Sequence, residues 1–100
     1  MYKSVIDIRS EVPKDLLSML VVMADKAFNN RAGHVKNMSK TPYRLSFEGE
    51  EKDFGCLELG MLTLENQKEF LSCVESWNWI DEDDPNENCD ILAEMLNPVR

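Results

Sequence analysis

The stretch PKDLLSMLVVMADKAF, residues 13–28, decides the fold that this sequence predicts. Pro13 suits the first turn of a helix, and Asp15 follows where a negative charge stabilises the helix dipole. From Leu16 onward the apolar side chains cover most of the helix circumference instead of one stripe. We therefore expect a largely buried central helix that ends in the polar segment containing Gly33, a residue able to adopt left-handed backbone geometry.

The segment before this helix supports two interpretations. Residues 4–7, Ser-Val-Ile-Asp, have the form of a capping box, and the apolar residues beside them follow helical spacing. Ile6 and Ile8 also alternate with polar residues, as in a short strand. Residues 4–11 therefore stay open between helix and strand.

The segment after the central helix alternates as strands do. A polar, basic connection over residues 31–42 leads to residues 43–47, where apolar and polar side chains alternate with period two. Residues 48–53 then form a turn and residues 54–59 a second strand. This order predicts an antiparallel β-hairpin.

Two further helices are expected in the second half. Gly60 breaks the strand pattern, and Thr63 can cap a helix over about residues 64–79. The inner face of that helix would carry Phe70, Val74 and Trp77.

The last helix has a clear start signal. Asp84 is an acidic N-cap, Pro85 stands at the first helical position and Glu87 at the third, and Asn97-Pro98 would end the helix. The sequence thus predicts an α+β fold: a largely helical single domain over residues 1–100 with a central antiparallel β-hairpin.

Size and composition fit one small domain in a reducing compartment. The chain has 100 residues, of which 43% are hydrophobic, enough for one modest core. Charges interrupt any apolar run at its start, so no secretory signal is expected, and the run at 19–23 is far below the roughly 20 residues that span a bilayer. The three cysteines, Cys56, Cys73 and Cys89, are odd in number and widely spaced, as expected of reduced thiols. The sequence predicts a cytoplasmic protein.

Charge is divided unevenly along the chain. Residues 1–45 hold eight Lys and Arg against four acids, a balance of +4, whereas residues 46–100 hold three against fifteen, a balance of −12. The densest point is Trp77-Asn78-Trp79-Ile80-Asp81-Glu82-Asp83-Asp84, where both tryptophans run into four carboxylates. Aromatic side chains beside a strong negative field favour binding of a basic protein.

The candidate binding residues follow from this stretch. Trp77 shares the predicted helix face with Phe70, so we expect it in the core. Trp79 lies about 200° further around a helix, and it would either pack at an inter-helix corner or stand exposed as a binding anchor. The predicted partner-binding residues are Trp79, Asp81, Glu82, Asp83 and Asp84, with Glu50, Glu51 and Asp53 as a second group.

Other chemistry has little support. Asp81, Asp83 and Asn86 loosely follow a calcium loop, but Asn86 and Leu92 stand where such a loop needs Gly and Glu. His34 is the single histidine and lies in a polar loop, so neither a zinc site nor a nucleophile–base pair is indicated. No glycine-rich phosphate loop is present, and the net charge of −8 opposes direct binding to nucleic acid. We expect no catalytic residues, no metal and no cofactor.

The size, the acidity of the second half, the reduced cysteines and the tryptophan–acid stretch over residues 77–84 resemble those of small bacterial immunity proteins of the contact-dependent growth inhibition type. That resemblance implies an inhibitor that binds a basic toxin domain, commonly a nuclease, and occludes its phosphate-binding site. Three alternatives remain open: a phage-type nucleic-acid mimic that binds a host DNA- or RNA-binding protein, a small enzyme using His34, and a structural adaptor.

Overall fold

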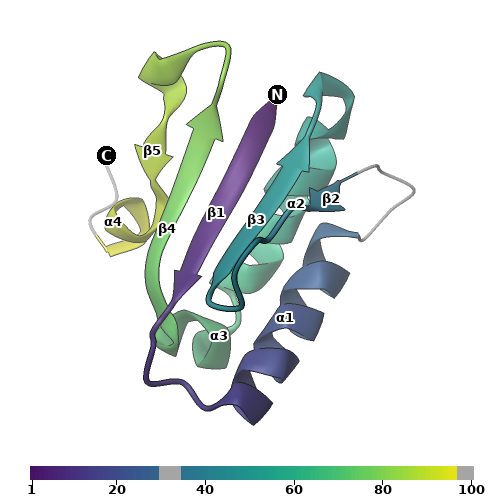
Figure 1. Ribbon diagram of the computed structural model, residues 1–100. Coiled ribbons are helices and arrows are strands. Elements are labelled where there is room, and N and C mark those ends of the chain that lie inside the picture. The colour runs from purple at the N-terminus through teal and green to yellow at the C-terminus, as the bar shows by residue number, and fades with distance from the viewer. Residues whose placement is uncertain (30–34, 97–100) are drawn as a thin grey trace.

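The computed structural model describes residues 1–29 and 35–96 (Figure 1). The strands are β1 (Tyr2–Ile8), β2 (Lys36–Asn37), β3 (Arg44–Gly49), β4 (Val74–Asp81) and β5 (Cys89–Asp90). The α-helices are α1 (Lys14–Phe28), α2 (Phe54–Glu65), α3 (Lys68–Ser72) and α4 (Ile91–Leu96), and two 3-10 turns are η1 (Glu51–Asp53) and η2 (Pro85–Glu87). The fold is α+β, as predicted.

The strands form one antiparallel sheet in the order β2-β3-β1-β4-β5. Helices α1 and α2 pack side by side across one face of this sheet, and the opposite face is open (Figure 1). Strand β1 lies at the centre, with β3 on one side and β4 on the other. Both neighbours run antiparallel to β1, so β3 and β4 end at the same end of the sheet, beside Tyr2.

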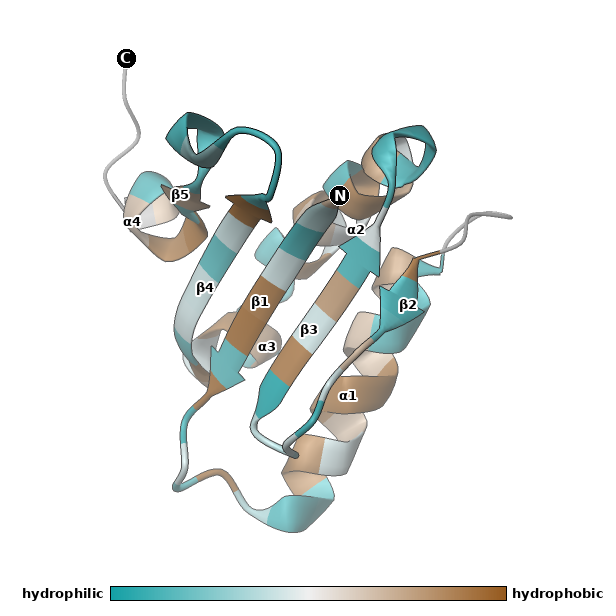
Figure 2. Ribbon diagram, turned by 45° about the horizontal axis from the view of Figure 1, so that its top comes forward, coloured by the Kyte–Doolittle hydropathy of each residue, from teal (hydrophilic) through white to brown (hydrophobic). Residues whose placement is uncertain are grey.

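Strand β1 resolves the ambiguity over residues 4–11 in favour of a strand. Ser4, Ile6 and Ile8 are buried against the helices, and the residues between them face the open side. In Figure 2 the middle of β1 is one hydrophobic band, because residues 5 and 6 are both apolar, so it is the burial and not the hydropathy that alternates along the whole strand. A capping box provides hydrogen bonds for only a few backbone N–H groups. Pairing with a strand on each side provides hydrogen bonds for nearly all backbone N–H and C=O groups of β1, so the segment forms a strand and not a helix.

The core lies between the sheet and the helix layer. Its largest fully buried side chain is Trp77, whose indole N–H donates to the Ser4 hydroxyl at 2.8 Å. Phe28 of α1 stacks on Phe47 of β3, with ring centroids 4.3 Å apart. Gly60 lets α2 approach this pair, because a Cβ there would come within 2.5 Å of the Phe28 ring. Burial of Trp77 confirms the prediction that it packs in the core.

The predicted helix after Pro13 and the first strand of the predicted hairpin are confirmed. The expectation that this helix is largely buried is wrong, because only five of its 15 residues are buried and Met19 and Val22 are 62% and 52% exposed on the side away from the sheet. Helix α1 begins one residue after Pro13, which serves as its N-cap, and β3 covers residues 44–49. The predicted strand at residues 54–59 is wrong, because this segment is the first half of α2, and Gly60 lies inside that helix. Strand β3 therefore pairs with β1 and β2, and the predicted hairpin does not form.

The predicted helix at 64–79 is also wrong. Helix α2 ends at Glu65, the short α3 follows, and residues 74–81 are the long strand β4. The register of β1 and β4 shifts between Asp7 and Ile8, so that Val74 and Trp77 are both buried although they are three positions apart, an odd spacing for one face of a strand. This β-bulge gives a strand the spacing of a helix, which explains the mistaken prediction.

The start signal of the last helix is half right. The Asp84 carboxylate accepts a hydrogen bond from the Asn86 amide at 3.2 Å, with Pro85 next to the cap as predicted. The helix that follows is only the 3-10 turn η2, and α4 begins later, at Ile91. Gly33, His34 and Asn97-Pro98 lie outside the described residues.

Candidate protein-binding surface

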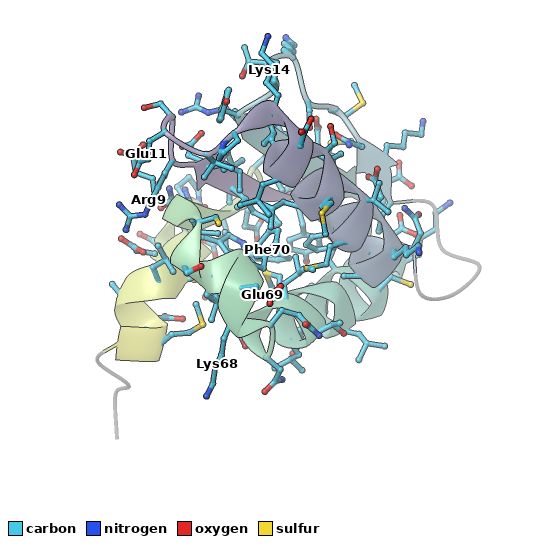
Figure 3. The ribbon with its side chains drawn as sticks, turned by 90° about the horizontal axis from the view of Figure 1, so that it is seen from below. Arg9, Glu11, Lys14, Lys68, Glu69 and Phe70 are labelled. Atoms are coloured by element: carbon cyan, nitrogen blue, oxygen red, sulfur yellow. The ribbon has the colours of Figure 1, made fainter. Side chains whose placement is uncertain are left out.

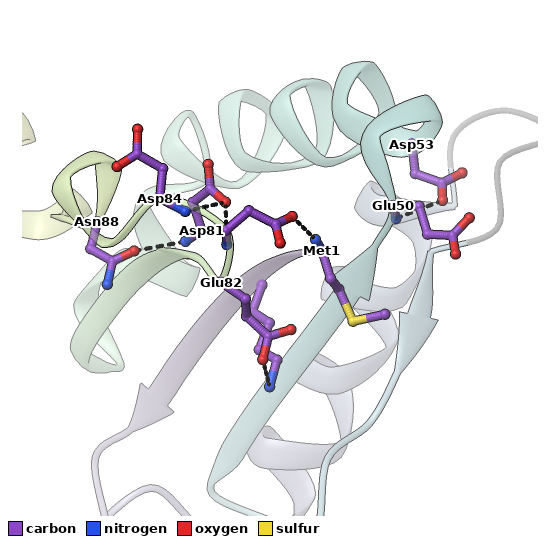
Figure 4. A network of polar contacts seen from close by, with 9 residues as sticks. Met1, Glu50, Asp53, Asp81, Glu82, Asp84 and Asn88 are labelled. Atoms are coloured by element: carbon purple, nitrogen blue, oxygen red, sulfur yellow. Dashed lines mark hydrogen bonds and ion pairs between the residues drawn. The ribbon is translucent and has the colours of Figure 1, made fainter.

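The fold brings the two predicted acidic groups to one end of the sheet. Strand β3 leads into residues 48–53 and β4 into residues 81–87, and Tyr2 pairs with both Gly49 and Asp81. We call residues 48–53 and 81–87 together the acidic end. Its two segments hold nine carboxylates, four and five respectively, and one basic residue, Lys52. Figure 4 shows the two groups on either side of Met1.

The β4–η2 loop is organised by its own carboxylates. Asp81 Oδ1 accepts hydrogen bonds from the backbone amides of Asp83 and Asp84, at 3.0 and 3.2 Å. The Asn88 side chain in turn accepts from the Asp81 amide at 2.7 Å (Figure 4). Asp81 and Asp84, two predicted binding residues, thus hold the loop backbone, and they present their negative charge from a fixed position.

The other half of the acidic end is a capped turn. The Asp53 side chain is only 3% exposed and accepts from the Glu50 amide at 3.0 Å, while Glu50 reciprocates toward Asp53 in a capping box. This arrangement satisfies the backbone amides of Glu50 and Asp53 around η1. Asp53 is therefore a structural residue, whereas Glu50 and Glu51 are exposed to solvent.

Two cations, Lys3 and the Met1 amino group, form three ion pairs with acids of these segments. Lys3 of β1 lies 3.4 Å from a carboxylate oxygen of Glu82 and 3.8 Å from one of Glu48, so it bridges the two groups. The Met1 amino nitrogen lies 2.9 Å from Asp83, whose side chain is 86% exposed. These cations offset part of the repulsion among the acids, and they leave the surface strongly negative.

Trp79 is buried, which corrects the expectation that it stands exposed as an anchor. Its exposure is 7% because it lies on the helix-facing side of β4. The Tyr2 ring stacks on it with centroids 5.3 Å apart, and Phe54 meets it edge-on at 5.7 Å. The aromatic side chains that reach solvent here are Tyr2, which is half-buried, and Phe54, which is 39% exposed.

Sequence reasoning missed Phe54 and Tyr2 as candidate binding residues. The strand predicted over residues 54–59 includes Phe54, although Leu57, Met61 and Leu64 follow it with helical spacing. That spacing was the available signal that Phe54 begins a helix. No local pattern marked Tyr2, because its position depends on pairing with two distant strands.

The opposite end of the sheet has balanced charge. Residues 9–14, 41–44 and 66–75 carry four basic residues and three acids. Figure 3 looks onto this end and shows Arg9, Glu11, Lys14 and Lys68 toward its edge, with Glu69 and Phe70 nearer the middle.

An ion pair on the open face adjoins that balanced end. Arg44 donates to the carboxylate of Asp7 at 2.7 and 3.2 Å, and the Ser76 hydroxyl donates to the same group at 2.9 Å. The Arg44 guanidinium, aided by Ser76, holds the pKa of Asp7 below its ordinary value. Asp7 therefore stays ionised and matched by a cation.

Other kinds of site have little support within residues 1–29 and 35–96. No three His, Cys, Asp or Glu side chains in these ranges are arranged to hold a metal ion. Burial, with Glu94 nearby, raises the pKa of the Cys89 thiol, which keeps that thiol protonated and weakly nucleophilic. No helix in the same ranges has the length and apolar character to cross a membrane. His34, the base of the enzyme alternative, lies outside them.

The open face of the sheet forms a broad trough of about 1310 Å³. Three basic and four acidic side chains line it, and two of each are matched in the Lys3–Glu48 and Arg44–Asp7 ion pairs. The trough is therefore close to neutral, unlike the acidic end. The acidic end, with nine carboxylates and one lysine in its two segments, is therefore our candidate binding surface among the described residues.

No protein-family model, curated protein or solved structure matches this chain.

Proposed function

We propose that this protein is a cytoplasmic inhibitor that binds a basic toxin domain, a nuclease, and neutralises it by charge-complementary occlusion. The observation that supports this is the meeting of two acidic segments, 48–53 and 81–87, at one end of the sheet. The segments are separated by α2, α3 and β4 in the chain, so local sequence alone does not require them to meet. The protein acts by binding and carries out no reaction.

The electrostatics of the acidic end favour a cationic partner. Asp53, Asp81 and Asp84 are bonded to backbone amides, which are neutral and leave the negative charge of each carboxylate in place. Nine carboxylates against one lysine within these segments, in a chain of net charge −8, attract basic surfaces from a distance and speed association at low salt.

The same hydrogen bonds make the surface rigid before binding. The β4–η2 loop is held through Asp81 and Asn88, and η1 through Glu50 and Asp53. A partner therefore meets carboxylates whose backbone is already ordered, so less conformational entropy is lost when the complex forms.

Nucleases suit this surface because they carry Lys and Arg side chains where they hold phosphates. A rigid set of carboxylates can occupy those cations in place of the nucleic acid. Inhibition of this type weakens as salt rises, since salt screens the attraction between the two surfaces.

The test begins with capture from the native host. The tagged chain is used to retain proteins at low salt, the retained proteins are eluted with a salt gradient, and each is identified and expressed alone. We expect a basic protein whose expression stops growth, and whose toxicity this chain relieves. Retention of no basic protein, or of one whose toxicity persists in the presence of the chain, would contradict the proposal.

Two charge-matched variants connect the result to the surface. The acidic-end variant carries Glu51→Gln, Glu82→Gln, Asp83→Asn and Glu87→Gln, which spares the carboxylates that hold the backbone. The control variant carries Glu11→Gln, Glu58→Gln, Glu69→Gln and Glu75→Gln, four exposed acids elsewhere. We expect relief of toxicity to fail with the acidic-end variant and to persist with the control variant.

A further inference from the structure

Three aromatic rings form a cluster at the acidic end, which we call the aromatic patch: Tyr2, Phe54 and Trp79. Tyr2 and Phe54 meet edge-on with centroids 5.2 Å apart, and each contacts Trp79. Trp79 is buried, so it supports the other two rings, which reach solvent. The supporting contacts fix the orientation of both exposed rings.

The aromatic patch lies between the two acidic segments. Phe54 directly follows Asp53, and Tyr2 pairs with Gly49 on one side and Asp81 on the other. The pKa of the Tyr2 phenol is raised, first by burial and then by the charges of Asp81, Glu51 and Asp83. Carboxylates from both segments are thus close enough to the phenol to affect its ionisation.

Exposed rings beside carboxylates match one kind of side chain well. A guanidinium stacks on an aromatic face through its plane while its N–H groups bond to carboxylates, and a lysine ammonium offers no such plane. An apolar ligand would gain from the rings but would leave the surrounding carboxylates without a cation. Charge and shape together therefore favour arginine.

We propose that the aromatic patch, with Glu51, Asp81 and Asp83, is a recognition site for an arginine side chain of the protein partner. That the partner is a toxin rests on the proposed function, whereas the preference for arginine rests on this surface alone. Phe54 is then the aromatic side chain that contacts the arginine directly, whereas the buried Trp79 acts only by supporting it.

The experiment uses the full chain labelled with ¹⁵N and two probes, hexaarginine amide and hexalysine amide, titrated at low salt. We expect hexaarginine to shift the amide signals of Tyr2 and Phe54 and the indole signal of Trp79, and to bind several-fold more tightly than hexalysine. Phe54→Leu, which keeps apolar bulk over Trp79, should weaken hexaarginine binding roughly fivefold. Leu62→Ala, at an exposed apolar residue of the same helix, should leave it unchanged.

The outcomes separate this inference from the proposed function. Hexaarginine binding that Phe54→Leu leaves unchanged, in a variant whose spectrum shows an intact fold, would overturn the arginine site. If the captured toxin also binds Phe54→Leu like the wild type, the inhibitor function stands without this site. If hexaarginine binds at the aromatic patch but the host yields no basic toxin, the site stands and the inhibitor function falls.

Discussion

The two ends of the sheet use their charged residues in different ways. At the balanced end, Asp7 finds a cation on the neighbouring strand, Arg44, at 2.7 Å. At the acidic end, Lys3 and the Met1 amino group pair with Glu48, Glu82 and Asp83, but Asp53, Asp81 and Asp84 bond to neutral backbone amides. An ion pair cancels charge, whereas a carboxylate bonded to amides keeps it. This difference supports our proposal that the acidic end binds a basic partner, whereas the ion pair at the balanced end contributes to the stability of the fold.

Loss of the core side chain Trp77 should have the largest effect on stability. Trp77 is fully buried and donates to Ser4 on β1, the strand that connects the two ends. We expect Trp77→Ala to lower the free energy of unfolding by about 3–5 kcal/mol, because it leaves a cavity and an unpaired hydroxyl. Urea denaturation followed by circular dichroism measures this loss. A loss below about 1 kcal/mol would contradict the assigned packing.

The acidic end can be divided into acids that hold the fold and acids that do not. Asp53 is buried and caps η1, so Asp53→Ala should cost about 1–2 kcal/mol of unfolding free energy. Asp53→Asn can still accept the Glu50 amide and should cost less. Glu51→Ala, at the exposed neighbour, should change stability by less than about 0.5 kcal/mol. Equal losses of unfolding free energy for Asp53→Ala and Glu51→Ala in urea denaturation would contradict the assignment of Asp53 as a structural residue and Glu51 as a non-structural one.

The Asp7–Arg44 ion pair beside the balanced end should make the free energy of unfolding depend on pH. Because the pKa of Asp7 is lower in the folded than in the unfolded protein, its contribution is complete above the unfolded value, about 3.9, and is lost as pH falls through the folded value. Arg44 is 64% exposed, so we expect only about 0.5 kcal/mol from this pair. Stability of wild type minus that of Asp7→Asn, measured at neutral pH and near pH 2, should shrink at the lower pH. An unchanged difference would contradict the assignment.

The sequence predicted those elements whose signals are local. Helix α1 has its start signal and its apolar pattern within one stretch, and β3 has its alternation within six residues. Burial of Trp77 was also predictable, even though its element was not, since a large aromatic residue near other apolar ones is buried in a helix or a strand alike.

Strand β4 and the common surface of the two acidic segments could not be predicted, because both depend on pairing between strands that are far apart in the sequence. Strand β4 carries a β-bulge, which hid its period of two, and only pairing with β1 reveals it as a strand. Convergence of the two acidic segments has the same origin, because β3 and β4 flank β1 from far along the chain. The acidic residues were therefore visible in the sequence, whereas their common surface and the exposure of Phe54 were not.

The most direct test of the central claim is the salt dependence of partner affinity for the two charge-matched variants. The dissociation constant of the captured partner is measured by calorimetry for the wild type, the acidic-end variant and the control variant, at about 0.05 M and about 0.5 M salt. We predict that the acidic-end variant binds about 10- to 100-fold more weakly at low salt and loses most of the salt dependence, while the control variant follows the wild type. Equal weakening by both variants would show that net charge alone governs binding and would contradict a binding surface at the acidic end.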